Sequence, residues 1–265
     1  MFDAESHSFV ICAYRESPYL EECIRSLRNQ TVRTNILMTT STPNEHIRGI
    51  AEKYQIPLCI NRGESGIAGD WNFALSAAET SLVTLAHQDD LYEPEYAEVM
   101  LKEMNRARNP ILFSCNYAEL RGDSRVTSSR LLNIKKILRV PMRMFPGRMW
   151  ARRMSLAFGD SICCPSVTYV RGIMEDHPFR KGFRSDLDWE KWEELSRLKG
   201  SFCYSNQILM CHRIHGDSET THVIREYSRS EEDYQIFRKF WPDRIARRLT
   251  RLYAGSEKSN EIQDS

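Results

Sequence analysis

Two adjacent acids, Asp89 and Asp90, follow an apolar run that begins at Leu82 and ends at His87. A strand that delivers acids at its carboxyl end places them in the crevice where open α/β sheets bind ligands. Two carboxylates there can hold a divalent cation against phosphate oxygens. The competing interpretation is a strand followed by a solvated acid pair that caps the next helix, and these residues alone favour neither.

The elements that must position these acids alternate between strands and helices. We predict strands at 8–14, 35–40, 57–60, 82–87, 111–117, 161–170 and 202–210. Between them we predict helices after Ser17, over 45–54, up to Ala78, over 94–106 and from 183–195, a polar loop at 118–129, and a helical tail whose last ten residues are disordered. This alternation is typical of an α/β fold with a mostly parallel sheet covered on both faces.

Three glycines, Gly63, Gly66 and Gly69, lie between a predicted strand and the helix that ends at Ala78. Such a loop allows the backbone to approach a ligand closely, and a helix N-terminus favours anions. The spacing matches neither a P-loop nor a Rossmann fingerprint. Ordinary turns also use glycine, so the loop by itself is weak evidence.

Composition indicates a soluble globular protein that keeps its thiols reduced. The 265 residues are 41% hydrophobic and 28% charged, with a net charge of +1, which gives no global attraction to nucleic acid. Eight cysteines without a signal-peptide pattern are typical of a cytosolic chain. No apolar run approaches transmembrane length. We therefore expect a cytoplasmic protein that lies at most on the inner face of a membrane.

A basic segment at 130–153 contains eight Lys and Arg residues, no acid, and apolar residues interleaved with the bases. It fits a surface for anionic lipid headgroups or for a lipid-diphosphate acceptor. A solvated basic helix that covers the sheet is an equal alternative. Nucleic-acid binding is less favoured because no recognised module accompanies the segment. A second basic stretch at 244–251 is a further candidate for membrane contact.

Four blocks occur in an order that is typical of one enzyme family. They are 10–16 (Val-Ile-Cys-Ala-Tyr-Arg-Glu), 88–90 (Gln-Asp-Asp), 187–192 (Leu-Asp-Trp-Glu-Lys-Trp) and 213–218 (Arg-Ile-His-Gly-Asp-Ser). Together they resemble family-two glycosyltransferases of the GT-A fold, over about residues 8–222. The resemblance is strongest to bacterial members that build capsule, exopolysaccharide or lipopolysaccharide.

The resemblance implies an open, mostly parallel, Rossmann-like central sheet flanked by helices, with a helical C-terminal tail. It implies a domain at 1–225, with a nucleotide-sugar half at 1–117 and an acceptor half at 118–225, followed by a basic tail at 226–265. The implied activity is inverting, metal-dependent transfer of a sugar from a nucleotide-diphosphate donor to a glycan acceptor that is lipid-linked. UDP is the default nucleotide, with dTDP and GDP open, and the metal is Mn²⁺ or Mg²⁺.

The resemblance also assigns roles to individual residues. Asp188 is the implied catalytic base, with Asp186 as the alternative and helix N-capping as the competing explanation for both. The implied metal ligands are Asp89, Asp90 and His215. The implied donor-binding residues are Ala13, Tyr14, Glu16, Asp70, Asn72, His87, Gln88, Asp89 and Arg213, with N-capping as the alternative for Asp70. Trp189 and Trp192 fit an acceptor pocket or the core equally.

Three positions depart from the family pattern. His87 replaces the first acid of the Asp-x-Asp motif, Leu187 replaces a glutamate before the base, and 39–41 (Thr-Thr-Ser) lacks an aspartate that would read uracil. A catalytically silent module that binds a nucleotide-sugar or a partner is therefore an alternative. A nucleotidyltransferase is less favoured because the loop at 14–18 is not a basic, glycine-rich triphosphate loop.

Overall fold

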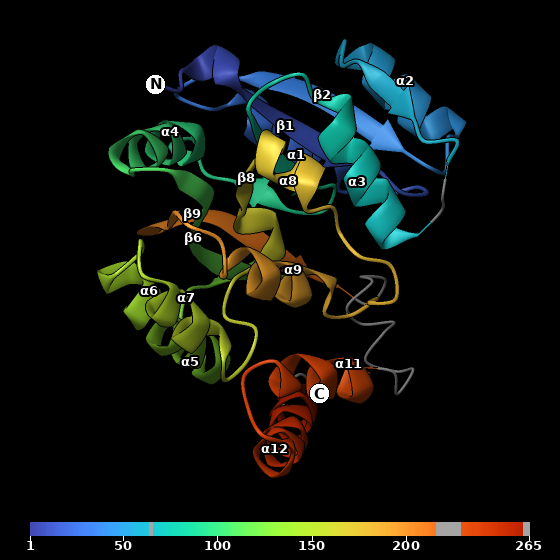
Figure 1. Ribbon diagram of the computed structural model, residues 1–265. Helices are drawn as coiled ribbons and strands as arrows, with labels where there is room; N and C mark the ends of the chain where they lie inside the picture. Colours follow the sequence, from blue (N-terminus) through green and yellow to red (C-terminus); the bar gives the residue numbers. More distant parts are fainter. Residues whose placement is uncertain (64–65, 216–228, 262–265) are drawn as a thin grey trace.

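The computed structural model describes residues 1–63, 66–215 and 229–261 (Figure 1). Its strands are β1 (His7–Cys12), β2 (Asn35–Thr40), β3 (Leu58–Ile60), β4 (Leu82–His87), β5 (Leu91–Tyr92), β6 (Pro110–Arg121), β7 (Ser124–Val126), β8 (Thr168–Val170) and β9 (Ser201–Ile214). Within the described residues they form one mixed sheet in the order β3-β2-β1-β4-β8-β6-β9-β5, with β7 paired to β6. The longest ladders, β6–β9, β1–β4 and β1–β2, are parallel.

Helices cover both faces of this sheet. The main ones in the first half are α1 (Leu20–Arg28), α2 (Glu45–Lys53), α3 (Ile67–Ala77) and α4 (Tyr96–Arg106), and those in the second half include α8 (Arg171–Asp176) and α9 (Leu187–Leu195). Phe9 and Ile11 of β1 pack on the face covered by α1, α2 and α4. Val10 packs on the opposite face with α3, α8 and α9. Alternate side chains of one buried strand thus serve two cores.

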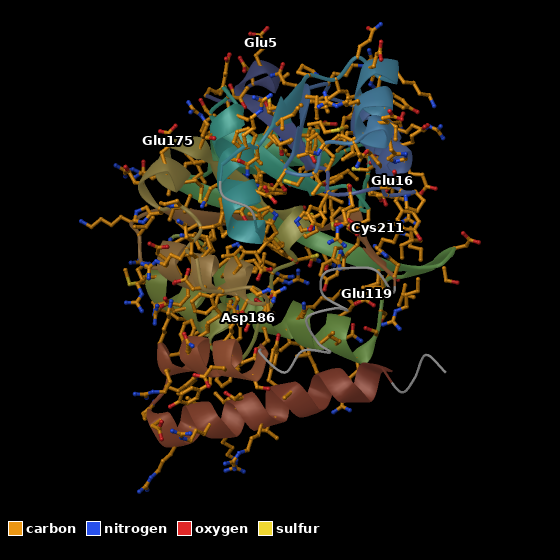
Figure 2. The ribbon with its side chains drawn as sticks, turned by 90° about the vertical axis from the view of Figure 1, so that its right-hand side faces the viewer. Glu5, Glu16, Glu119, Glu175, Asp186 and Cys211 are labelled. Carbon is orange, nitrogen blue, oxygen red and sulfur yellow. The ribbon has the colours of Figure 1, made fainter. Side chains whose placement is uncertain are left out.

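The two halves of the sheet meet at β8, which pairs antiparallel with β4 and with β6. The predicted strand at 161–170 is reduced to β8 because a 3₁₀ turn, η2 (Cys164–Ser166), contains Pro165 and interrupts it. The predicted polar loop at 118–129 is wrong: β6 continues to Arg121 and turns back as β7. Pairing with β9 buries Glu119 there (Figure 2), although its local sequence is polar.

The basic segment forms three short helices, α5 (Arg130–Leu138), α6 (Val140–Met144) and α7 (Met149–Leu156). Pro141 lies in the first turn of α6. Two of the arginines are buried rather than solvated. Arg139 donates to the backbone carbonyl of Cys115 and to Asn116, and Arg152 donates to backbone carbonyls between α9 and β9. The segment therefore covers the sheet through these two side chains.

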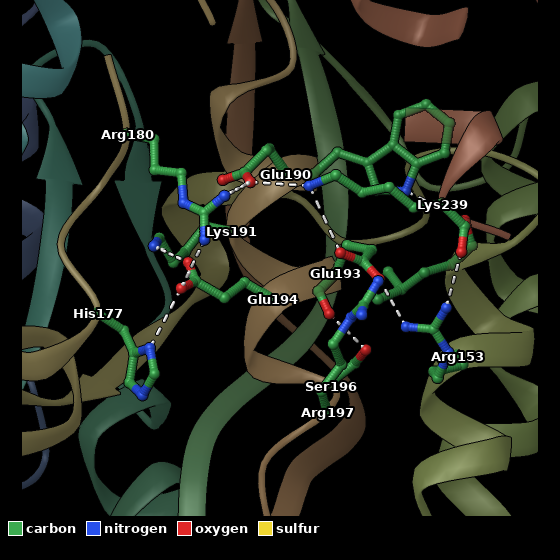
Figure 3. A network of polar contacts seen from close by, with 12 residues as sticks. Arg153, His177, Arg180, Glu190, Lys191, Glu193, Glu194, Ser196, Arg197 and Lys239 are labelled. Atoms are coloured by element: carbon green, nitrogen blue, oxygen red, sulfur yellow. Dashed lines mark hydrogen bonds and ion pairs between the residues drawn. The ribbon is translucent and has the colours of Figure 1, made fainter. Parts of the chain in front are cut away.

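The C-terminal tail folds back on the domain as α11 (Arg229–Arg238) and α12 (Asp243–Glu261). Phe237 and Ala246 belong to the same buried cluster as Trp189 of α9. Acids of α9 are paired with cations of α7 and of the tail, including Arg153 and Lys239 (Figure 3). The disorder expected for the last ten residues is wrong as far as Glu261, because α12 continues to that residue; residues 262–265 lie outside the described part.

Among the described residues, none of the helices combines the length and the apolar character that crossing a bilayer requires.

Candidate active site

The carboxyl ends of three neighbouring parallel strands are level with one another. Cys12 at the end of β1 pairs with Thr39 of β2 on one side and with His87 of β4 on the other. The loops that follow these strands therefore meet at one edge of the sheet. This is the edge at which open α/β sheets bind ligands.

The loop after β1 is held to the loop after β4. Ala13 is buried and its amide donates to the carbonyl of Thr39 at 2.9 Å. Tyr14 and Gln88 bond reciprocally: the Tyr14 amide donates to Gln88 Oε1 at 3.0 Å, and Gln88 Nε2 donates to the Tyr14 carbonyl at 2.9 Å. The Tyr14 ring remains exposed. Glu16 is exposed as well (Figure 2). These residues lie where the sequence predicts a nucleoside, with two side chains accessible.

Asp70 joins three elements at this edge. Its carboxylate accepts hydrogen bonds from Ser41 Oγ and from Asn61 Nδ2, both at 2.8 Å. These partners follow β2 and β3, whereas Asp70 itself lies in the first turn of α3. The N-cap of α3 is Gly66 at φ 108°, a conformation that glycine adopts readily. The N-cap explanation for Asp70 is therefore wrong.

Asn72 braces α3 against the segment that leads to α9. Its side-chain amide donates to the Phe179 carbonyl at 2.9 Å and its oxygen accepts from the Phe179 amide at 2.8 Å. Trp71 packs edge-on against the Phe179 ring and stacks on His87, with ring centroids 5.5 Å apart. These contacts link the two halves of the chain, and a nucleoside contact of Asn72 stays a prediction.

Asp90 is fully buried beneath the strand ends. Its Oδ1 forms a hydrogen bond with His212 Nδ1 at 3.0 Å and accepts one from the Arg213 amide at 2.8 Å. Burial alone would lower the pKa of His212, but the charge and the hydrogen bond of Asp90 raise it above its usual value. Burial lowers the pKa of the neighbouring His87, which favours its neutral form. Asp90 is thus held by β9 at the base of the site.

Asp89 lies above it and contacts His215. Its Oδ2 and His215 Nε2 are 2.8 Å apart. Burial would raise the pKa of Asp89, but this bond and the nearby histidines lower it. Arg213 Nε donates to the Asp89 carbonyl at 2.9 Å, its Nη2 reaches Glu22 at 2.6 Å, and its guanidinium lies 4.2 Å from the Tyr19 ring centroid. Arg213 therefore ties β9 to α1 and to the acid pair.

Asp186 and Asp188 have different surroundings at the start of α9. Asp186 is 1% exposed and occupies the N-cap position without a side-chain cap bond. The N-capping explanation for Asp186 thus holds for its position but not for a side-chain cap bond. Asp188 is half-buried in the first turn and accepts a bond from the Trp189 amide at 2.7 Å. Of the two carboxylates, Asp188 is the more accessible.

The turn η2 relates the acid pair to the start of α9. Burial raises the pKa of Cys163 and of Cys164 well above the usual value, and a nearby carboxylate adds to each shift. For Cys163 that carboxylate is Asp90, and for the next residue, Cys164, it is Asp188. Asp90 is thus near Cys163, which directly precedes η2, and Asp188 is near Cys164, the first residue of η2.

Trp189 and Trp192 are both fully buried. The indole nitrogen of Trp189 donates to the Leu156 carbonyl at 3.1 Å, and its ring meets that of Phe237 edge-on. The acceptor-pocket interpretation of these two residues is wrong, and they belong to the core.

Several residues of the site were not predicted. They are Tyr19, Glu22, Ser41, Asn61, Trp71, Phe179 and His212. His212 had the clearest signal, since it directly precedes Arg213 in a strand that leads to the site. Glu22 shows only as an acid in the first turn of a helix. Of the fourth block, Gly216, Asp217 and Ser218 lie outside the described residues.

A family model described as glycosyl transferase family 2 matches residues 8–160, more than half of the chain. The chain belongs to this family. A curated relative, EpsH of Bacillus subtilis (strain 168), is 28% identical over 116 residues, which are 42% of this chain and 33% of EpsH. The match thus spans about a third of that relative's length.

Solved structures show that this family 2 chain has the α/β architecture of GT-A glycosyltransferases, as predicted. Mannosyltransferase PcManGT from Pyrobaculum calidifontis, in complex with GDP-Man and Mn²⁺, superposes with a TM-score of 0.65 at 13% identity, over 94% of this chain and 69% of that one. S. aureus TarS 1-349 with UDP-GlcNAc gives 0.61 at 14% identity, over 92% and 70%. Glucosyl-3-phosphoglycerate synthase from Mycobacterium tuberculosis, with Mn²⁺, UDP and phosphoglyceric acid, gives 0.60 at 15% identity, over 90% and 80%.

The residues of this family 2 site fit a divalent cation whose coordination a diphosphate would complete. Within the described ranges, no three His, Cys, Asp or Glu side chains gather into a metal cage. Asp89 and His215 are nevertheless in contact, and Asp90 Oδ2 and His87 Nε2 are buried without a hydrogen-bond partner among those residues. Mg²⁺ is usually held by one or two carboxylates together with substrate phosphates, which this donor set permits.

Proposed function

We propose that this chain is an inverting glycosyltransferase that moves one sugar from a nucleotide-diphosphate donor to a hydroxyl group of a glycan. The observation that carries this proposal is the convergence of Asp70, Asp89 and Asp90 at the carboxyl ends of β1, β2 and β4, where Ser41, His215 and the Arg213 amide bond to them. Membership of glycosyl transferase family 2 supports it. We infer that the catalytic domain is 1–225, with nucleotide-sugar and acceptor halves at 1–117 and 118–225.

In the proposed reaction, the acceptor oxygen forms a bond to the anomeric carbon while the bond from that carbon to the diphosphate breaks. Attack from the opposite face inverts the configuration. Asp188 accepts the proton of the attacking hydroxyl, a task that requires a reachable carboxylate. Its partial exposure supports this role, whereas Asp186 is buried. The departing nucleoside diphosphate carries away the bonding electrons.

The charge that develops on the diphosphate must be neutralised. We propose Asp89 and His215 as the residues that would hold a divalent cation, with Asp90 and His87 beneath them. When bound, the cation would act as a Lewis acid on the diphosphate oxygens. Arg213 would add positive charge, since guanidinium suits phosphate. Mn²⁺ suits a set that includes imidazole better than Mg²⁺ does.

For the donor we propose binding of the nucleoside at the loop after β1, through the Ala13 backbone, the Tyr14 ring and Glu16. The reciprocal Tyr14–Gln88 bonds support this by holding the loop against the acid pair. UDP remains the default nucleotide. Ser41, in place of a base-reading acid, already bonds Asp70, so other bases stay possible.

For the acceptor we propose a lipid-linked glycan in surface polysaccharide synthesis. The protein would then work in the cytoplasm at the inner face of the membrane. The basic stretches at 130–153 and 244–251 would supply the contact.

The experiment that tests the donor and metal proposals is thermal unfolding with UDP, GDP and dTDP, each with Mn²⁺ or with excess chelator. A diphosphate that binds the folded state raises the midpoint of unfolding, and we expect this rise to require Mn²⁺. Asp89→Asn and His215→Gln should remove the Mn²⁺-dependent part of the rise. Arg48→Gln is a matched control, since Arg48 is an exposed cation within α2 and is not one of the site residues.

A rise of equal size in chelator would contradict the metal proposal. No rise with any of the three nucleotides would contradict donor binding. A chain that binds a sugar nucleotide but neither transfers the sugar nor slowly hydrolyses the donor would instead favour a catalytically silent module.

A further inference from the structure

The helices α5, α6 and α7 carry large apolar side chains on their solvent side. Six of them, Ile134, Ile137, Met144, Phe145, Met149 and Trp150, are between 42% and 68% exposed. The rings of Phe145 and Trp150 are in contact, with centroids 5.4 Å apart. A group of exposed large apolar side chains on neighbouring helices marks an interaction site more often than single scattered ones do. We call these six residues the apolar face.

Positive charge accompanies the apolar face. The chain contains no Asp or Glu from Ser124 to Gly159. Arg130 of α5 and Arg143 of α6 are exposed, as is Arg148, which directly precedes α7. The buried Arg139 and Arg152 bond to backbone carbonyls and are withdrawn from this surface. The large exposed side chains of this segment are therefore apolar or cationic, and its exposed cations are a subset of its basic residues.

We propose that the apolar face lies in the headgroup layer of an anionic lipid bilayer. Helices that bind in this way place Trp, Phe and aliphatic residues at the acyl boundary, and Lys or Arg beside the anionic headgroups. The complete lack of acids over this span matches a uniformly anionic surface. The three helices lie together on the side of the molecule away from β1, β2 and β3 (Figure 1). A bilayer can therefore meet them without covering the nucleotide-sugar half.

This surface is directly connected to the helix that carries the candidate base. Trp189 of α9 donates to the Leu156 carbonyl at the end of α7, and Arg153 of α7 pairs with Glu193 of α9 at 2.6 Å (Figure 3). Lipid contact would thus hold α9 close to the bilayer. With α9 close to the bilayer, Asp188 would be near a lipid-linked acceptor. This catalytic consequence rests on the proposed function. The binding itself is measurable without donor or acceptor.

The experiment is flotation of the full chain with vesicles of phosphatidylcholine alone or mixed with phosphatidylglycerol, at low and at high salt. We expect flotation with the mixed vesicles at low salt, little with phosphatidylcholine, and a decrease in high salt. The double variants Ile137→Ser/Trp150→Ser and Arg143→Gln/Arg148→Gln should each reduce partitioning about tenfold. Arg33→Gln/Arg48→Gln removes two exposed arginines from the nucleotide-sugar half and should change it less than about twofold.

Thermal unfolding of each variant shows whether it is folded, and we expect unchanged midpoints because all substituted residues are exposed. Failure of the wild-type chain to float with mixed vesicles at low salt would overturn the proposal. Flotation of either surface variant at the wild-type level would also overturn it. A dimer that Ile137→Ser/Trp150→Ser abolishes, without flotation, would assign the face to a second copy of the chain. Nucleotide binding is unaffected by any of these results, so the proposed function is tested separately.

Discussion

Asp186 and Asp188 are only two positions apart, yet the fold gives them different chemical possibilities. A general base must come within hydrogen-bonding distance of the proton that it removes. Asp186 is 1% exposed and cannot approach a glycan without movement of the backbone, whereas Asp188 is half-buried at the start of α9. The sequence indicates both residues as candidates for the base, and the exposure of their side chains favours Asp188 over Asp186.

We predict that Asp188→Asn lowers kcat about 10²- to 10⁴-fold while donor KM changes little, because the amide keeps the size of the side chain but cannot accept the proton. Asp186→Asn is the matched control and should retain most of the activity. Steady-state kinetics with saturating acceptor would measure kcat and donor KM of both variants. Without acceptor, the rate of donor hydrolysis would serve instead. A folded Asp186→Asn variant that loses as much kcat would transfer the role to Asp186.

At the scale of elements, the start of α9 is organised by the tail. Glu232 of α11 is buried and accepts hydrogen bonds from three consecutive backbone amides, those of Arg184, Ser185 and Asp186, at 2.8–3.1 Å. Lys239, which directly follows α11, pairs with Glu190 of α9 at 2.8 Å. The tail thus holds both the first turn of α9 and the segment before it, although it lies outside the catalytic domain proposed at 1–225.

We predict that Glu232→Gln loosens the segment before α9. The neutral side chain of Gln would form weaker hydrogen bonds than the carboxylate, and its NH₂ group would face backbone N–H groups that also donate. We expect this to lower the unfolding free energy by about 2 kcal/mol. Hydrogen exchange at the amides of 184–186 should accelerate, and kcat should decrease with little change in donor KM. Glu231→Gln is the matched control, because Glu231 is an exposed acid of the same helix. Equal exchange rates in the two variants would contradict this role of Glu232.

At the scale of the whole molecule, a chain of buried polar contacts crosses the centre of the sheet. His7 of β1 bonds to Thr84 of β4 at 2.8 Å, Thr84 to Thr168 of β8 at 2.6 Å, and Thr168 to Tyr96 of α4 at 3.0 Å. Burial lowers the pKa of His7 from 6.5 to about 3. The two halves of the sheet are therefore joined through a histidine that the fold keeps neutral.

This gives the molecule a predictable dependence on acid. Between pH 6.5 and about 3 the unfolded chain binds a proton at His7 that the folded chain does not. The contribution of neutral His7 to the unfolding free energy is complete above pH 6.5. It is lost as the pH falls from 6.5 to about 3, by up to about 1.4 kcal/mol per pH unit. His7→Gln, which does not titrate, should flatten the decline of the unfolding free energy by this amount. Urea unfolding from about pH 7 to about pH 5 measures it, and parallel curves for the two proteins would contradict the prediction.

The sequence by itself determined the elements whose signals are local. β2 has the predicted bounds, β4 begins at the predicted Leu82, and α2 differs by a single residue, because the spacing of their buried side chains and the Asn44 cap are properties of short segments. The position of Asp89 and Asp90 at a strand end follows in the same way. The order of the four motif blocks also indicated the family, which the family match confirms.

Only the tertiary structure decided what depends on residues far apart in the chain. The polar extension of β6 and the hairpin with β7 form because β9 supplies the partner backbone. Arg139 and Arg152 look like surface cations in the sequence, but carbonyls of other segments bind them inside the fold. The contacts of Asp90 with His212 and of Glu232 with the segment before α9 also join distant positions. Such contacts arise from packing between elements, which the periodicity of a single segment does not encode.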